Sequence, residues 1–243
     1  MKVNKIKTLW KRIDTYIRAH KEYFIFAAIA LFVVGVSFAR IMDKTVKRRT
    51  MPVQFLVVHW TANTAPGASA RANAYYLRNK RNAGTHYCID DEEVIQCTDE
   101  NNVAYAVGDS KWFGFLPKPW YDGKIYNNNS ISFEMCLGGD RNDSIVEDWT
   151  AQLIGKRLVT YGLDISRVVR HHDVSGKHCP RFCYGDTEWN QHREDSCFVE
   201  FKKTVEYYHQ VNLFRKQIWK QTNEWLDTIP PHIGESITTY QLQ

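Results

Sequence analysis

The sequence predicts an α/β protein with a central mixed β-sheet flanked by helices, preceded by one N-terminal transmembrane or signal-anchor helix. Buried-strand patterns, such as the β-branched and aromatic run at 53–60, alternate with helical patterns, and this alternation favours a mixed α/β sandwich. The chain has 243 residues, of which 44% are hydrophobic, so it can bury a substantial core. A charge-free apolar run near the N-terminus predicts the membrane helix.

The apolar run is residues 23–39, YFIFAAIALFVVGVSFA, which follows a basic segment at 1–22 and precedes a basic linker at 40–52. As a helix it would be about 25 Å long, the short end of what crosses a bilayer. We expect a signal anchor with a cytoplasmic N-terminus; a cleaved signal peptide and a buried helix are the alternatives. The domain that follows is then expected on the periplasmic or extracellular side of the inner or cytoplasmic membrane, or secreted after cleavage.

The formal net charge of +5 is modest, and much of the positive excess lies in the first fifty residues. A nucleic-acid-binding domain shows a basic patch or stripe on its folded part. We therefore expect no nucleic-acid partner and take a monomer as the expected state.

The first half of the soluble chain predicts a strand, a helix and a hairpin. The run at 53–60 is typical of a buried strand that ends near His59, and turn chemistry follows it. The segment 68–80 has the composition and spacing of a helix packed on one face. Residues 85–90 and 94–98 flank an acidic turn and indicate a hairpin.

The second half continues the alternation. A buried strand is expected at 130–137, before a Gly-Gly break, then a helix at 148–162 and a short strand at 167–171. Apolar residues from Phe198 onward recur at helical spacing and predict one or two amphipathic helices. We expect these helices to cap the sheet; a face that binds a partner or the cell wall is the alternative.

Six cysteines in an exported chain are able to form disulfides. Cys183 and Cys197 are the favoured pair because they are close in sequence, and a Cys88–Cys97 bridge would cross the predicted hairpin. Free buried thiols are the alternative for Cys88 and Cys136. The connectivity cannot be read from one sequence.

The segment VVRHHDVSGKHCP, residues 168–180, concentrates reactive side chains. A hydrolytic zinc site uses three protein ligands and leaves one position for water, and imidazole and thiolate suit that metal. His171 and Cys179 are joined by a Ser-Gly turn that allows both side chains to face one point. His59, at the end of the first strand, is the candidate for the third ligand. Each residue alone is a weak indication, because a single histidine at a strand end is more often structural.

Several segments, taken in order, resemble the zinc-dependent N-acetylmuramoyl-L-alanine amidases, whose fold is shared by phage lysozyme-type amidases and peptidoglycan recognition proteins. The resemblance runs from about 53 to 201, and its most specific part is HHDVSGKHCP at 171–180. It implies an amidase domain at 53–205 and leaves 206–243 as a C-terminal amphipathic helical extension. The other segments that carry it are VVHWTANTAPGASARANAYYLRN, HYCIDDEEVIQC, AVGD and NNNSISFEMCLGG.

The resemblance assigns a role to each site residue. It implies that His59, His171 and Cys179 bind Zn²⁺, that Lys177 stabilises the oxyanion, and that Glu134 is the general base. A carboxylate in the apolar strand around Glu134 is costly to bury unless it has a task, which agrees with this role; a salt-bridged rim residue is the alternative. The implied substrate is peptidoglycan, cleaved between the lactyl group of muramic acid and L-alanine, in wall remodelling or phage-type lysis.

The sequence departs from the family pattern at two places. Thr85 stands where phage lysozyme-type members carry a tyrosine, and the segment 105–108 lacks a histidine that many bacterial relatives have. Asp173 is expected either to orient a ligand imidazole or to cap a turn. His86, His172 and His178 compete for structural or supporting roles. The aromatic loop 110–129 is expected to pack on the body or to line the cleft.

Three other functions compete with the hydrolase. A non-catalytic peptidoglycan-binding module is the main alternative, and loss of the cysteine ligand would mark it, whereas Cys179 is present. A cysteine peptidase is disfavoured because Cys179 precedes a proline in a loop, not a helix N-terminus that would lower its pKa. A membrane protein with a decayed domain is disfavoured because all five site residues are retained.

Overall fold

The computed structural model describes residues 37–40, 47–78, 83–108, 124–181 and 190–227. The chain consists of two compact units, 1–37 and 38–243. Everything below concerns the second unit, together with the strand that begins at Ser37.

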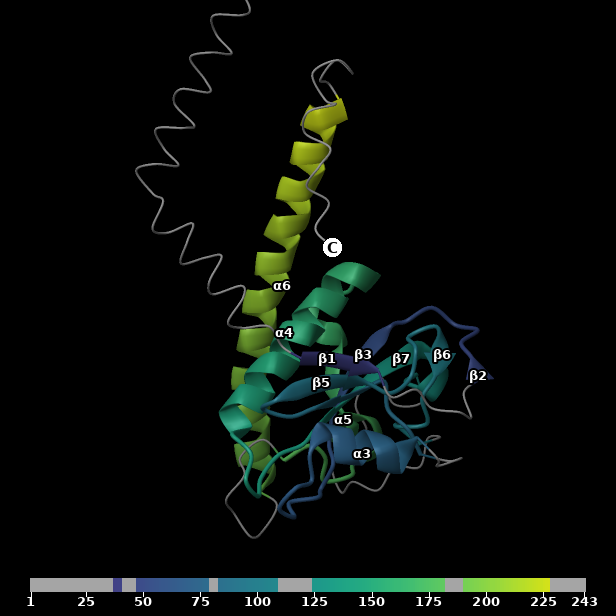
Figure 1. The fold of residues 1–243 in the computed structure, drawn as a ribbon, viewed down its shortest axis with the longest axis vertical. Coiled ribbons are helices and arrows are strands. Elements are labelled where there is room, and N and C mark those ends of the chain that lie inside the picture. The colour runs from purple at the N-terminus through teal and green to yellow at the C-terminus, as the bar shows by residue number, and fades with distance from the viewer. Residues whose placement is uncertain (1–36, 41–46, 79–82, 109–123, 182–189, 228–243) are drawn as a thin grey trace, which may run out of the picture. The chain divides into compact units, whose positions relative to one another are not determined.

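A six-stranded mixed sheet forms the centre of this unit (Figure 1). Its strand order is β1-β5-β4-β7-β3-β8, in which β4, β7, β3 and β8 are parallel neighbours and β5 runs antiparallel to β4. This confirms the predicted mixed sheet. The strands are β1 (Ser37–Arg40), β3 (Phe55–Trp60), β4 (Tyr87–Ile89), β5 (Glu93–Gln96), β7 (Ser130–Met135) and β8 (Val168–Arg170); a separate antiparallel pair joins β2 (Lys47–Arg48) to β6 (Asn102–Val103).

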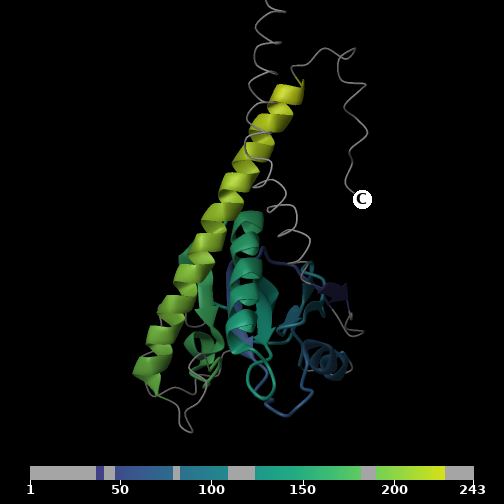
Figure 2. The same cartoon turned by 60° about the vertical axis from the view of Figure 1, so that its left-hand side comes forward.

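Helices cover both faces of the sheet. On one face, α4 and α6 lie side by side, as both ribbon views show (Figures 1 and 2). The shorter helices α3 and α5 contact the sheet through β4, β5, β3 and β8. The helices are α3 (Ala70–Leu77), α4 (Asp143–Tyr161), α5 (His171–Ser175) and α6 (Gln191–Asp227), with 3-10 turns η1 (Asn127–Asn129) and η2 (Ile165–Arg167).

Each face of the sheet has its own core. Tyr87 and Phe133 are buried in adjacent strands and stack 5.4 Å apart, and the Tyr87 hydroxyl accepts a hydrogen bond from Arg157 of α4. On the opposite face, Cys88 and Ile95 pack against Ala70 and Ala74 of α3. Neighbouring residues on a strand point to opposite faces, so the even and odd positions of β4 and β7 serve different cores.

The close approach of α4 and α6 depends on Gly155. A Cβ atom at this position would meet the backbone nitrogen of His209 at 2.8 Å and the Cβ of Tyr208 at 2.8 Å. The Tyr208 hydroxyl also donates to both carboxylate oxygens of Asp148, at 2.9 and 3.0 Å. The helices are therefore in contact through backbone as well as side chains.

Several predicted boundaries differ from the structure. α4 begins five residues earlier than expected, because the Asn142 side chain caps it by accepting from the backbone N–H of Ile145. Its end at Gly162, in the left-handed conformation with φ 63°, is as predicted. α6 is one continuous helix, so it crosses the expected boundary between 53–205 and 206–243 without a break.

The expected linker 40–52 contains strand β2 and a structural arginine. The Arg49 guanidinium donates to the carbonyls of Glu100, Asn128, Asn102 and Ser130 at 2.6 to 3.2 Å. Five donors in a fixed fork suit this role, and they fasten the segment after β2 to the body. The C-terminal end of the expected linker thus contacts the folded unit.

The predicted membrane helix at 23–39 lies mostly outside the described residues. Its last three residues belong to strand β1 and not to a helix, which corrects that end of the prediction. Among the residues that the structure describes, none of the helices combines the length and the apolar character that crossing a bilayer requires.

The cysteines are largely reduced in the described part of the chain. Cys88 and Cys97 are buried free thiols whose sulfurs lie 3.6 Å apart, so the hairpin bridge is not formed and the alternative of free thiols holds for Cys88 and Cys136. Cys197 is disulfide-bonded. Its expected partner, Cys183, lies outside the described residues.

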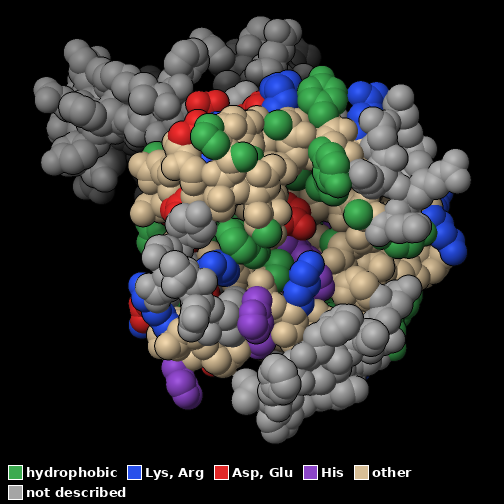
Figure 3. Space-filling model, turned by 90° about the horizontal axis from the view of Figure 1, so that it is seen from below, with side chains coloured by type: hydrophobic (Ala, Val, Ile, Leu, Met, Phe, Trp, Pro, Cys, Tyr) green, Lys and Arg blue, Asp and Glu red, His purple; other side chains and the backbone are tan. Residues whose placement is uncertain are grey.

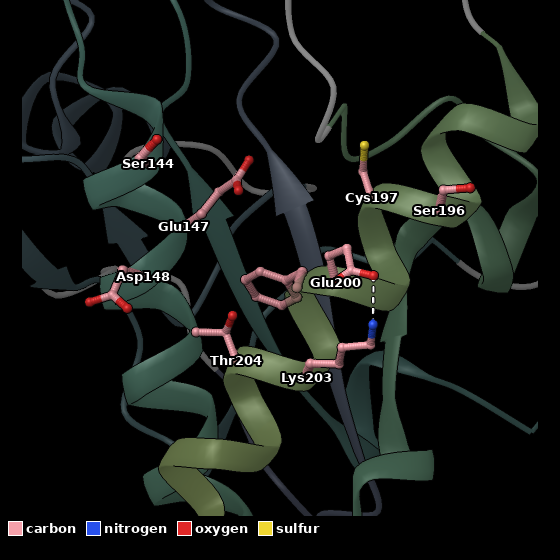
Figure 4. Close-up of a pocket in the computed structure, with 9 residues that line it drawn as sticks. Ser144, Glu147, Asp148, Ser196, Cys197, Glu200, Lys203 and Thr204 are labelled. Atoms are coloured by element: carbon pink, nitrogen blue, oxygen red, sulfur yellow. Dashed lines mark hydrogen bonds and ion pairs between the residues drawn. The ribbon is translucent and has the colours of Figure 1, made fainter.

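A pocket of about 540 Å³ opens between the N-terminal halves of α4 and α6 (Figure 4). Glu147 and Asp148 line it from α4, and Glu200 and Lys203 line it from α6, where they form a 2.7 Å ion pair. Burial, and then the charges of Asp143 and Glu194, raise the pKa of Glu147 to about 7. The ionised form of Glu147 is thus disfavoured in the folded state.

We predict that Glu147→Gln stabilises the protein above pH 7 and not at pH 4. The folded-state pKa is raised from 4.5, so the cost of ionisation begins near pH 4.5 and is complete above about pH 7. Because the side chain is partly solvated, we expect a gain on the order of 1 kcal/mol in unfolding free energy at pH 8. Denaturant unfolding at both pH values measures it. Glu200→Gln, an exposed carboxylate of the same pocket, is the control and should show no such gain; an equal gain at pH 4 contradicts the prediction.

Candidate metal centre

The candidate ligands meet at the carboxyl end of three parallel strands. His59 is the penultimate residue of β3, and Glu134 is its direct partner on β7. His171 follows the last residue of β8 and begins α5. The carboxyl ends of parallel strands lie at one edge of a sheet, which brings residues 112 positions apart in sequence to the same point.

The three candidate ligands have the geometry of a metal site. The Nδ1 atoms of His59 and His171 are 3.2 Å apart, and the Cys179 sulfur is 4.0 Å from His59 Nδ1. All three ligand atoms lie within 4.8 Å of one another. Metal–ligand distances of about 2.0 Å for nitrogen and about 2.3 Å for sulfur put tetrahedral ligands about 3.3 to 3.6 Å apart. The donor set therefore fits a small tetrahedral cation.

The loop between His171 and Cys179 is closed by its own backbone. The His172 N–H donates to the Cys179 carbonyl, the Gly176 N–H donates to the His172 carbonyl, and both distances are 2.6 Å. Gly176 has φ 74°, a conformation that glycine adopts without strain and that ends α5. The His172 ring contacts the Lys177 carbonyl at 2.9 Å. This short turn is what returns the chain to His171.

Burial keeps both histidines neutral. Desolvation, with the positive charge of Lys177 among the further causes, lowers the pKa of His171 to about 4 and that of His59 well below its ordinary range. A neutral imidazole is the form that binds a metal. Burial, and then the charge of Glu134, raise the pKa of the Cys179 thiol, and the backbone of Trp60 and the charge of Lys177 oppose part of that rise. These two groups favour the thiolate that a metal requires.

Glu134 lies beside the ligand cluster without joining it. One of its carboxylate oxygens is 4.0 Å from His59 Nδ1, and the other is buried and has no hydrogen-bond partner among the described residues. Burial raises its pKa to about 7, and the positive charge of Lys177 opposes that rise. An unsatisfied buried carboxylate with a pKa near neutrality suits proton transfer. The salt-bridged rim residue is not what the structure shows.

Lys177 is exposed and yet electrostatically part of the site. Its charge affects the pKa values of His59, His171, Cys179 and Glu134. The space-filling view from below shows histidine side chains in a hollow, with basic and acidic side chains beside them (Figure 3). A cation at the open side of such a hollow can meet negative charge that develops on a bound molecule.

A support for His171 was not predicted from the sequence. The backbone of Val107 lies beside the His171 ring and raises the pKa of that ring, against the larger opposite effect of burial. The Val107 segment is held by Asn127, whose buried Oδ1 accepts from the backbone N–H groups of Ala106 and Val107, both at 2.9 Å. Such a partner fixes the orientation of a ligand imidazole. In the sequence, this support is indicated by the polar run NNN at 127–129, directly before the buried strand.

The other predicted supporting residues have structural roles. Asp173 caps α5 by accepting from the Arg170 N–H at 2.8 Å, so its turn-capping role is confirmed. His86 is buried and is not one of the three clustered ligands; it accepts from the Ser132 N–H and contacts Arg49. Thr85 is buried and donates to the Ser132 carbonyl. Trp112, Phe113, Trp120 and Tyr121 of the aromatic loop lie outside the described residues.

A family model described as N-acetylmuramoyl-L-alanine amidase matches residues 49–182. A probable N-acetylmuramoyl-L-alanine amidase from Bacillus licheniformis is 35% identical over 138 residues, which is 53% of this chain and 36% of that protein. The amidase XlyB of Bacillus subtilis (strain 168) is 31% identical over 147 residues, 58% of this chain and 41% of that protein. The chain therefore spans less than half the length of these curated relatives.

Solved structures with the same fold include a mutant endolysin from Bacillus subtilis, at 25% identity and a TM-score of 0.55. The match covers 70% of this chain and 99% of that one. The catalytic domain of XlyA matches at 25% identity with a TM-score of 0.53 and the same coverage. The described α/β unit thus shares the fold of these two solved structures.

We predict that Asn127→Ala weakens metal binding about 10- to 100-fold, because the Val107 backbone beside the His171 ring loses its anchor. Competition with a coloured chelator measures the affinity for zinc, and circular dichroism in the absence of metal reports on the fold. Asn128→Ala is the matched control, since Asn128 belongs to the same turn but bonds to Thr50. Equal zinc affinities for the two variants would refute the role of Asn127.

Proposed function

Because the chain belongs to the N-acetylmuramoyl-L-alanine amidase family, we propose that it is a zinc-dependent amide hydrolase. The bond cleaved joins the lactyl group of N-acetylmuramic acid to the L-alanine of the peptidoglycan stem peptide. The observation that carries the proposal is the convergence of His59, His171 and Cys179 within 4.8 Å, beside the buried carboxylate of Glu134. Two imidazoles and a thiolate are a donor set that suits zinc and leaves a fourth position open.

Zinc, when bound, supplies a Lewis acid that polarises a carbonyl and makes a water molecule more acidic. Glu134 is the residue that receives the proton of the attacking water. Its raised pKa, about 7, makes it able both to accept that proton and to release it near neutral pH. The same carboxyl then delivers the proton to the nitrogen of the leaving L-alanine, so the amine departs neutral.

Lys177 stabilises the negative charge that appears on the lactyl carbonyl oxygen during attack. The side chain is exposed, and its charge acts on all three ligands and on Glu134. Stabilisation of a developing oxyanion by a placed cation is commonly the largest electrostatic contribution to amide hydrolysis. Lys177 thereby acts on the transition state more than on the ground state.

A non-catalytic peptidoglycan-binding module is the second candidate function. A recognition module has no need of an unsatisfied buried carboxylate beside a metal site, and maintaining one costs stability. Glu134 and Cys179 together therefore favour hydrolysis. Either wall remodelling or phage-type lysis is compatible with this chemistry.

We also propose that residues 23–39 hold the domain at the inner or cytoplasmic membrane, with the catalytic unit on the periplasmic or extracellular side. The support is the charge-free apolar run between basic flanks. A secreted form after cleavage is the alternative. Both locations give the domain access to peptidoglycan.

Digestion of purified peptidoglycan tests the proposed bond. We expect new L-alanyl amino termini with intact glycan strands, identified by mass spectrometry of the products. Glu134→Gln should lower kcat by about 10²- to 10⁴-fold while zinc remains bound, because it removes the proton acceptor and leaves the ligands. Cleaved glycan, cleaved cross-links, or full activity of Glu134→Gln would reject the proposal.

Cys179→Ser tests the metal assignment. We expect it to bind zinc far more weakly and to lose hydrolysis, while the fold persists, because a hydroxyl is a poor zinc ligand compared with a thiolate. Zinc content by elemental analysis, activity with and without a chelator, and circular dichroism are the measurements. Cys136→Ser, which replaces a buried thiol outside the cluster, is the control. Unchanged turnover of Cys179→Ser would remove it from the ligand set.

A further inference from the structure

α6 has two parts with different surroundings. In its N-terminal part, every third or fourth residue is buried against the body: Glu194, Phe198, Phe201, Val205 and His209. This is the spacing of one helical face, and it lies toward α4. From residue 213 to 220 every side chain is exposed. Both ribbon views show α6 continuing past the end of α4 (Figures 1 and 2).

From residue 207 onward, α6 exposes large apolar side chains. Tyr207, Phe214 and Trp219 are 64%, 63% and 70% exposed, and Ile218 is 45% exposed. Tyr207, Val211, Phe214 and Ile218 are spaced by four, three and four residues, which places them on one side of a helix. Counted at 100° per residue, this apolar stripe lies roughly opposite the face that packs on α4.

The charge of the same segment has one sign. Residues 207–220 contain Arg215, Lys216 and Lys220 and no aspartate or glutamate. Arg215 and Lys216 lie beside and opposite the apolar stripe when projected down the helix axis. Aromatic and aliphatic side chains on one face with cations around the other are typical of helices that lie in the surface of an anionic bilayer.

We propose that residues 207–220 of α6 form a docking surface for an anionic lipid bilayer, with the stripe of Tyr207, Val211, Phe214 and Ile218 in the headgroup region. Tyrosine and tryptophan favour this depth, because they combine an apolar ring with a polar group. The proposal does not depend on the amidase activity or on an anchor at 23–39. Its consequence is a second attachment that fixes how the catalytic unit lies on the membrane.

A second copy of the chain fits this surface less well. Two α6 segments packed along the stripe would bring Arg215 and Lys216 of both chains close together, and residues 207–220 contain no aspartate or glutamate. Like charges close together disfavour such pairing. An anionic surface instead attracts the segment by about 1 kcal/mol per Lys or Arg.

The test uses the full chain in lipid nanodiscs and a nitroxide label at residue 214, introduced as Phe214→Cys. A label on α6 reports on this helix, whereas bulk binding would also report on residues 23–39. In discs of phosphatidylglycerol we expect the label to be shielded from a water-soluble relaxing agent and accessible to oxygen. In discs of phosphatidylcholine it should remain exposed to water.

Charge variants measure how much the cations of α6 contribute to docking. Arg215→Gln combined with Lys216→Gln should lower the ratio of docked to undocked label about 30-fold in anionic discs, about fivefold for each cation. Lys156→Gln combined with Lys203→Gln removes the same charge from exposed positions on α4 and on the first part of α6. This control should leave the ratio unchanged.

Three results would overturn the proposal. In the first, the label remains water-accessible in both lipids. In the second, the labels on two chains broaden each other's spectra, which indicates self-association. In the third, the label becomes immobile only after peptidoglycan is added, which makes the surface a wall-binding one. None of these readouts requires catalysis, so failure of the amidase proposal would be recognised separately by its products.

Discussion

The parallel pairing of β3 with both β7 and β8 is the constraint on which the site depends. The register sets His59 opposite Glu134, and it ends β8 one residue before His171. A slip of one residue would turn every side chain of a strand to the other face. The core and the metal centre are therefore specified by the same hydrogen bonds, and neither can be changed alone.

The site is built from groups that burial keeps neutral. Desolvation lowers the pKa values of His59 and His171 and raises that of Glu134. The candidate ligand cluster thus has little charge of its own, and Lys177 at the surface biases Glu134 and Cys179 toward ionisation. The apolar environment and the charge of Lys177 together explain why the two histidines are neutral and why the pKa of Glu134 is close to neutrality.

The two faces of the sheet have different tasks. The face of α3 and α5 carries His59 and Glu134 among small and apolar side chains, whereas the opposite face is covered by α4 and α6. α6 extends beyond the end of α4. The side chains of this last part of the helix are therefore not covered by α4 and are exposed. The catalytic hollow and the exposed part of α6 therefore belong to different regions of one unit.

The sequence by itself determined the α/β class, the principal strands, and His59, His171 and Cys179 as the candidate ligand set. These follow from local periodicity and from a specific motif, and both are written within short segments. Only the tertiary structure decided the support of His171 by Val107 and Asn127, the single long α6 and the reduced state of Cys88 and Cys97. Each of these depends on contacts between residues distant in sequence or on how far a helix extends beyond its neighbour, and no local pattern encodes such geometry.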